Sequence, residues 1–76
     1  MNNPLIYFKH PIVVRFDNLR IEEEAYRIQS LIQTVAANTR ETGVVIYHQI
    51  YQENLNILNN NGFIAYYEGP FTRINW

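Results

Sequence analysis

Two histidines are the side chains best suited to metal or acid–base chemistry in this sequence, and they form no known ligand motif. His10 and His48 lie far apart and cysteine is absent, so neither a histidine-rich nor a thiolate metal site is predicted. His48 follows an apolar run with the character of a parallel strand, and α/β proteins place ligands at the carboxyl ends of such strands. His48 could therefore be a general base. We favour the other interpretation, in which His48 leads into a helix and its ring forms a hydrogen bond with the backbone.

The other candidates for catalysis are one serine and three consecutive carboxylates. Ser30 is the single serine and has no histidine near it in sequence, so an activated nucleophile is not predicted. Glu22, Glu23 and Glu24 fall in the first turns of a predicted helix, where the helix dipole favours negative charge. Adjacent helical residues point in different directions. We therefore expect a solvated acidic face and not a metal or acid–base site.

No glycine-rich loop is available to bind a phosphate group. Gly43, Gly62 and Gly69 are isolated, and each lies at the end of a predicted element. Together with the missing nucleophile and metal constellations, this predicts a protein that is not an enzyme, that needs no cofactor and that has no small-molecule substrate.

The length and composition of the chain favour one small domain that relies on contacts with other chains. Its 76 residues predict a single domain, 1–76. A chain this short buries only about 60% of its unfolded surface, and without cysteine it has no disulfide to compensate. Aromatic residues make up 14% and charged residues only 17%, a balance typical of interface centres. We therefore expect self-association or a protein partner.

Neither a membrane nor a nucleic acid is favoured as that partner. No apolar run approaches the roughly 20 residues that cross a bilayer, and a net charge of −1 gives little attraction for phosphates. One pattern keeps a nucleic-acid alternative open, because basic residues lie among aromatic ones along the predicted strands, as in sheets that stack single-stranded bases. Its members are Lys9, Arg15 and Arg73 with Tyr7, Phe8, Tyr66 and Phe71.

Two helices are predicted from apolar spacing. The first covers about 18–41, with an N-cap from Asp17 and Asn18 and with Gly43 as its C′ residue. The second covers about 50–61, before a run of asparagines and a glycine that favours a helix end. The apolar stripe of the first is Ile21, Ala25, Ile28, Ile32 and Val35, and that of the second is Tyr51, Leu55 and Leu58.

Four strands complete the predicted fold, which is of the α/β or α+β class with two layers. Strands 12–16, 44–48 and 63–68 are separated by helices, so we expect them to run parallel. Strand 71–76 returns through a two-residue turn and should lie antiparallel at an edge. The sheet is therefore predicted to have three or four strands, mostly parallel, with an antiparallel C-terminal hairpin.

Two consequences follow for the exposed surface. Both helices are expected on one face of the sheet, which leaves the other face open unless a partner or residues 5–8 cover it. The first helix, at roughly 33 Å, is also longer than a strand of roughly 17–20 Å. It should overhang the sheet, unless its last two turns are loop.

Residues 25–76 resemble a pattern shared by many small uncharacterised proteins of tailed bacteriophages. The residues that carry the resemblance are Ala36-Ala37, Gly43-Val44-Val45, Leu58 with Asn61-Gly62-Phe63, and the closing Thr72-Arg73-Ile74-Asn75-Trp76. Serine is more usual at the position of Asn75. The resemblance implies a phage origin and supplies no catalytic residues.

Together these patterns predict a non-enzymatic phage-type protein that acts through protein–protein contacts. A structural or accessory component of a virion is the favoured role, and an intracellular inhibitor that binds a host defence factor is the alternative. The protein would accordingly be found in the virion or the host cytoplasm. Its interface is expected among aromatic residues at the strands, with Trp76 either anchoring a partner or closing the core. The candidates are Tyr7, Phe8, Tyr66, Phe71 and Trp76.

Overall fold

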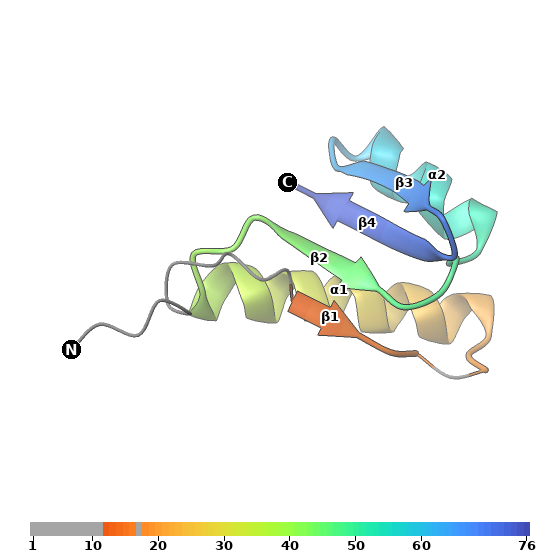
Figure 1. The fold of residues 1–76 in the computed structure, drawn as a ribbon, viewed down its shortest axis with the longest axis horizontal. Helices are drawn as coiled ribbons and strands as arrows, with labels where there is room; N and C mark the ends of the chain where they lie inside the picture. The colour runs from red at the N-terminus through yellow and green to blue at the C-terminus, as the bar shows by residue number, and fades with distance from the viewer. Residues whose placement is uncertain (1–11, 17) are drawn as a thin grey trace.

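Two helices pack on a four-stranded sheet (Figure 1). The computed structural model describes residues 12–16 and 18–76, so the predicted strand character at 5–8 lies outside the described residues. The α+β class, with two helices and a mixed sheet, is as predicted. In chain order the elements are β1 (Ile12–Val14), α1 (Ile21–Asn38), β2 (Gly43–Ile46), α2 (Gln52–Asn60), β3 (Ile64–Glu68) and β4 (Phe71–Asn75).

The strands lie in the order β1-β2-β4-β3. β1 pairs with β2 in parallel, whereas β4 is antiparallel to both β2 and β3. β1, β2 and β3 therefore point the same way, as predicted. The prediction of a mostly parallel sheet with the last strand at its edge was wrong, because β4 inserts between β2 and β3. The unit β2–α2–β3 is thus a split β-α-β arrangement.

Burial explains why the C-terminal strand takes the inner position. Thr72 and Ile74 on β4 are both 0% exposed, whereas Ala65 is the one residue of β3 classed as buried. An inner strand has neighbours on both sides, so it suits the segment with more side chains to bury. The hairpin turn allows β4 to lie either at the edge of the sheet or between β2 and β3. The sequence pattern alone did not decide between these two positions.

α1 is shorter than predicted at both ends. It begins after Arg20, whose backbone N–H donates to the Glu23 carboxylate (3.2 Å), one half of a capping box. It ends where the side chains of Asn38 and Thr39 donate to carbonyls one turn back, at 2.9 and 2.8 Å. These bonds satisfy the terminal carbonyls without extending the helix. The predicted N-cap residue Asp17 lies outside the described residues.

Gly43 does not cap α1, contrary to the prediction. It is the first residue of β2 and pairs with Asn75 of β4. A Cβ atom at this position would collide with the Asn75 side chain and lie 3.0 Å from the Ile74 carbonyl oxygen. Glycine therefore suits the close approach of these two strands, because a larger residue would displace the Asn75 side chain and crowd the Ile74 carbonyl.

The chain turns after α2 and after β3 at the predicted glycines. Gly62 follows α2 with a φ of 92°, and the N–H of Phe63 donates to the Leu58 carbonyl, as in a helix C-terminal motif. Gly69 has a φ of 60° and precedes Pro70, whose φ is fixed near −65°. Positive φ at only the first central residue is typical of a type II′ turn, which suits a two-residue hairpin.

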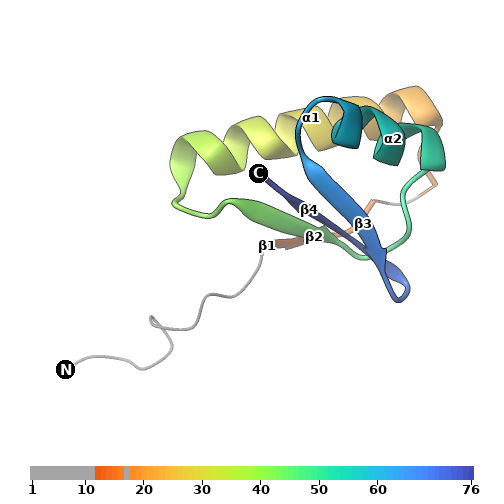
Figure 2. The same ribbon diagram turned by 90° about the horizontal axis from the view of Figure 1, so that it is seen from above.

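The core lies between the sheet and the two helices, which cover the same face of the sheet (Figure 2). No helix lies over the other face in the described part of the chain. α1 remains longer than any strand, and Ile28 and Val35 of its apolar stripe are buried in this core, with Leu31 and Ile32 partly buried against it. The buried core comprises Ile28, Val35, Val44, Ile46, Ile50, Leu55, Leu58, Ala65 and Ile74.

Candidate interaction surface

Glu24 is the one buried acidic residue in the described part of the chain. It lies in the first turn of α1 and is only 2% exposed. Glu22 and Glu23 are exposed, as predicted, but the expectation of a solvated face was wrong for Glu24. The physical reason is helical periodicity, because Glu24 precedes Ile28 by one turn and so shares the apolar stripe of the helix.

The Glu24 carboxylate connects α1 to the start of α2. Its Oε1 atom accepts hydrogen bonds from the backbone N–H of Tyr51 (2.8 Å) and from the Asn54 side chain (2.9 Å). Its Oε2 atom lies 3.3 Å from His48 Nε2. Tyr51 is the N-cap of α2, so the carboxylate also lies at the positive end of that helix dipole.

The geometry of His48 differs from the favoured interpretation, because its ring bonds to a carboxylate and not to backbone. Nε2 is taken by Glu24, and Nδ1 is buried with no hydrogen-bond partner among the described residues. Phe16 covers the ring edge-on at 6.1 Å between centroids. A general base needs an accessible ring nitrogen within reach of a substrate proton, and neither nitrogen of His48 meets that condition in this arrangement.

Further hydrogen bonds fix the connection from β2 to α2. The hydroxyl of Thr72 donates to the His48 carbonyl (2.8 Å) and accepts from the Ile50 N–H (3.0 Å). The hydroxyl of Tyr67 donates to the Ile50 carbonyl at 2.6 Å. Burial, with the negative charges of Glu24 and Glu53 as lesser causes, raises the pKa of Tyr67. These bonds connect the segment between β2 and α2 to Tyr67 of β3 and Thr72 of β4. They lie beside a cavity of about 490 Å³.

The open face of the sheet holds a different set of side chains. We use the term open face for the residues that point away from the helices, which the strand register identifies. Four of the seven exposed large hydrophobic residues lie there: Val13, Tyr47, Ile64 and Tyr66. The remaining described members of the open face are Arg15, Gly43, Val45, Glu68, Phe71, Arg73 and Asn75.

Tyr47 is the centre of a stack of three side chains on this face. Its ring lies parallel to that of Phe71, with 4.6 Å between centroids and 14° between planes. The guanidinium carbon Cζ of Arg15 lies 5.4 Å from the Tyr47 centroid, within the range of a cation–π contact. β1 and β4 flank β2 on opposite sides. Arg15 and Phe71 therefore cover the two faces of the Tyr47 ring.

Beside this stack, Arg73 and Glu68 form an exposed ion pair. Arg73 Nε donates to Glu68 Oε1 at 2.7 Å. That hydrogen bond is the main reason why the pKa of Arg73 is raised above its usual value. Arg73 also pairs across the strands with Tyr66 and with Val45. The pair neutralises one of the two arginines of the open face.

The free edge of β3 is partly closed by a side chain. The N–H of Ala65 donates to Asn59 Oδ1 (3.0 Å), and the Ala65 carbonyl accepts from Asn59 Nδ2 (2.9 Å). Asn59, near the end of α2, thus occupies both backbone groups that an added strand would use at this point. Such protection of an edge strand disfavours edge-to-edge pairing.

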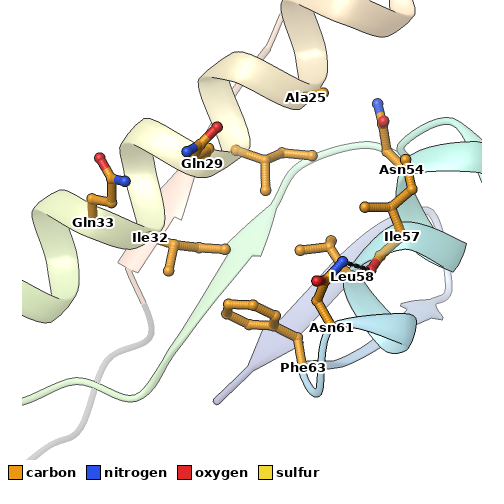
Figure 3. A pocket seen from close by; sticks show the side chains of 10 residues that line it. Ala25, Gln29, Ile32, Gln33, Asn54, Ile57, Leu58, Asn61 and Phe63 are labelled. Atoms are coloured by element: carbon orange, nitrogen blue, oxygen red, sulfur yellow. Dashed lines mark hydrogen bonds between the residues drawn. The ribbon is translucent and has the colours of Figure 1, made fainter.

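A groove of about 540 Å³ separates α1 from α2 (Figure 3). Its floor is apolar, with Ile32 of α1 facing Leu58 and Phe63 across it. Amide side chains, such as Gln29 and Gln33 of α1, line its rim, and no charged residue is among those that line it. The groove offers apolar contact but no acid, base or nucleophile.

The predicted interface residues divide between the two sides of the sheet. Tyr66 and Phe71 lie on the open face, whereas Trp76 lies on the helix side. Trp76 is half-buried against the core and meets Phe63 edge-to-face, with 6.4 Å between centroids. The other two candidates, Tyr7 and Phe8, lie outside the described residues.

Two negative observations apply to the described residues. No helix there is long and apolar enough to cross a membrane. Within the same residues, no group of three or more His, Asp or Glu side chains is placed to hold a metal ion.

Comparison with protein-family models, with curated proteins and with solved structures finds no match to the chain. The resemblance of residues 25–76 to small phage proteins therefore stays a prediction.

Proposed function

We propose that the chain is a non-enzymatic protein that acts through protein–protein contacts made by the open face of its sheet. The observation that carries this proposal is the stack of Arg15, Tyr47 and Phe71, over which no helix of the described part of the chain lies. Tyrosine and arginine are among the residues most enriched at interface hot spots. Aromatic rings that are already held in place lose little conformational entropy on binding.

The distribution of apolar surface supports the same face. Four of the seven exposed large hydrophobic residues among those described lie on the open face, and exposed apolar surface on a small domain is typical of an interaction site. The edge of β3 is a less favourable site, since Asn59 already bonds to Ala65 there. The junction around Glu24 and His48 is a less favourable site for chemistry, because its hydrogen-bonding groups serve the fold.

Within this class we propose a small accessory component of a phage particle. The support is the resemblance of residues 25–76 to small proteins of tailed phages, together with an open face suited to docking on another subunit. A host-directed inhibitor would use the same face, so the two roles differ in the identity of the partner.

Site-specific photo-cross-linking tests the proposal. Replacing Tyr66 by p-benzoylphenylalanine places a reactive group on the open face, and the same replacement at Tyr26, which is 69% exposed on α1, provides a matched control. We expect the chain with the probe at position 66, made in its native cells, to form a discrete adduct with one protein. The purified partner should then bind the chain, and Tyr47→Ala should abolish that binding.

Two outcomes would contradict the proposal. Adducts of equal yield from positions 26 and 66 would indicate non-specific contact. A partner whose binding survives Tyr47→Ala would bind elsewhere. The abundance of the adduct in purified particles, compared with soluble cell extract, separates the virion role from the inhibitor role.

A further inference from the structure

The open face carries an excess of positive charge, which bears on what it binds. Its charged members among the described residues are Arg15, Arg73 and Glu68. Glu68 is occupied by Arg73 at 2.7 Å. Arg15 forms no hydrogen bond or ion pair with any described residue, and its guanidinium lies over the Tyr47 ring. Its N–H groups therefore have no acceptor among the described residues and are available to an anionic partner.

The area of the open face argues against a second copy of the chain as the occupant. Four strands about 4.8 Å apart and about five residues long cover roughly 19 by 17 Å. Stable interfaces bury about 800 Å² on each partner, more than a patch of this size presents. Two copies would also bring the same excess of positive charge together, which opposes association.

We propose that the open face binds a segment of a different protein in which a carboxylate lies next to an apolar or aromatic side chain. The carboxylate bonds to the guanidinium of Arg15, and the apolar side chain packs on Val13, which precedes Arg15 by two residues on the same face and is 45% exposed. Arginine binds carboxylates through two parallel hydrogen bonds, which fixes orientation as well as affinity. This inference rests on the proposed function and adds the chemistry of the partner.

A nucleic acid would also present anions to Arg15, but the stack disfavours it. Base-stacking platforms need exposed aromatic faces, and Arg15 and Phe71 already pack on the Tyr47 ring, which leaves Tyr66 as the exposed ring on the described part of this face. The Glu68 carboxylate would also repel a phosphate backbone.

Selection from a library of random eight-residue peptides with the purified full chain tests this chemistry. We expect selected peptides to carry Asp or Glu within two positions of an aromatic or large apolar residue. For one such synthetic peptide, Arg15→Gln should raise the dissociation constant at least tenfold. Arg27→Gln on α1 is the matched control, because Arg27 is exposed but lies away from the sheet, and it should leave the constant unchanged.

Three results would overturn the inference. Peptides that lose binding with Tyr47→Ala, yet show no acidic enrichment and no effect of Arg15→Gln, would overturn the partner chemistry while leaving the proposed function intact. A library that yields no binder sensitive to Tyr47→Ala would also overturn it, and the cross-linking experiment would then judge the proposed function separately. Binding of a twelve-residue oligo(dT) that is tighter than the best peptide and is lost with Arg15→Gln would assign the face to single-stranded nucleic acid instead.

Discussion

The side-chain amide of Asn59 takes the place of a neighbouring strand for Ala65, accepting from its N–H at 3.0 Å and donating to its carbonyl at 2.9 Å. Because β3 is an edge strand, this arrangement limits the pairing of one chain with another. It makes this edge a less favourable site for a partner than the open face that we propose.

Replacing Asn59 by alanine should therefore promote self-association. The variant exposes the backbone groups of Ala65 and loses three hydrogen bonds, two to Ala65 and one to the Leu55 carbonyl, each worth about 1 kcal/mol. Sedimentation velocity should show a concentration-dependent dimer that the native chain does not form. Asn60→Ala, one position further along α2, is the control and should stay like the native chain. A monomeric Asn59→Ala variant would show that the edge is protected by something other than this amide.

Glu24→Ala should be among the most destabilising substitutions in the chain. It removes the acceptor of the Tyr51 N–H and one of the two acceptors of Asn54 Nδ2, which keeps only its bond to the Ile21 carbonyl. Losing one partner of a buried charged network costs about 3–5 kcal/mol. Glu22→Ala, at an exposed position, should cost about 0.5 kcal/mol through the helix dipole alone. Urea unfolding of both variants measures the difference, and equal costs would mean that the carboxylate is not a structural link.

Tyr67 should make the stability of the fold sensitive to alkaline pH. Burial and the nearby carboxylates raise its pKa above the usual 10.0, so the folded state holds this proton after the unfolded chain has released it. The contribution of Tyr67 is then fully present below pH 10 and is lost as the pH rises above that value.

Tyr67→Phe should remove this part of the alkaline loss, although it also costs about 1 kcal/mol below pH 10, where the native hydroxyl donates to the Ile50 carbonyl. Glu53→Gln should shift the Tyr67 titration, followed by NMR of ¹³C-labelled tyrosine, towards lower pH. An unchanged titration in that variant would exclude the charge of Glu53 as a cause.

Trp76→Ala should lower stability without affecting partner binding. The indole lies on the core side of the sheet against Phe63, so about 2–3 kcal/mol is expected, below the 3–5 kcal/mol typical of fully buried tryptophan. Thermal unfolding and the affinity for the cross-linked partner, measured on the same variant, separate the two effects. Lost binding with unchanged unfolding would make Trp76 the interface anchor.

Local patterns in the sequence predicted the elements well, and what they could not give was the order of the strands. The spacing from Ile28 to Val35 and the glycines at 62 and 69 were sufficient for helices and turns, because these depend on neighbouring residues. The position of β4 depends on competition between strands for the interior. That competition is decided by total burial and not by any one segment.

The candidate site was only partly predictable for a related reason. Tyr66 and Phe71 were identified from their type, whereas Tyr47 was only placed within the predicted strand 44–48, and its exposure was not predicted. Its pairing opposite Phe71 needs the order β2-β4, which the sequence did not reveal. The burial of Glu24 could have been found, since it lies one turn before Ile28 on the apolar stripe.

The most direct test of the central claim is to map the bound partner on the chain by NMR. Backbone amide shifts of the ¹⁵N-labelled chain, recorded with the cross-linked partner or its binding segment, should change most at Val13, Arg15, Tyr47, Tyr66 and Arg73. They should change little along α1. Changes centred instead on Gln29, Ile57 and Phe63 would place the partner in the groove between the helices and contradict the assignment of the open face.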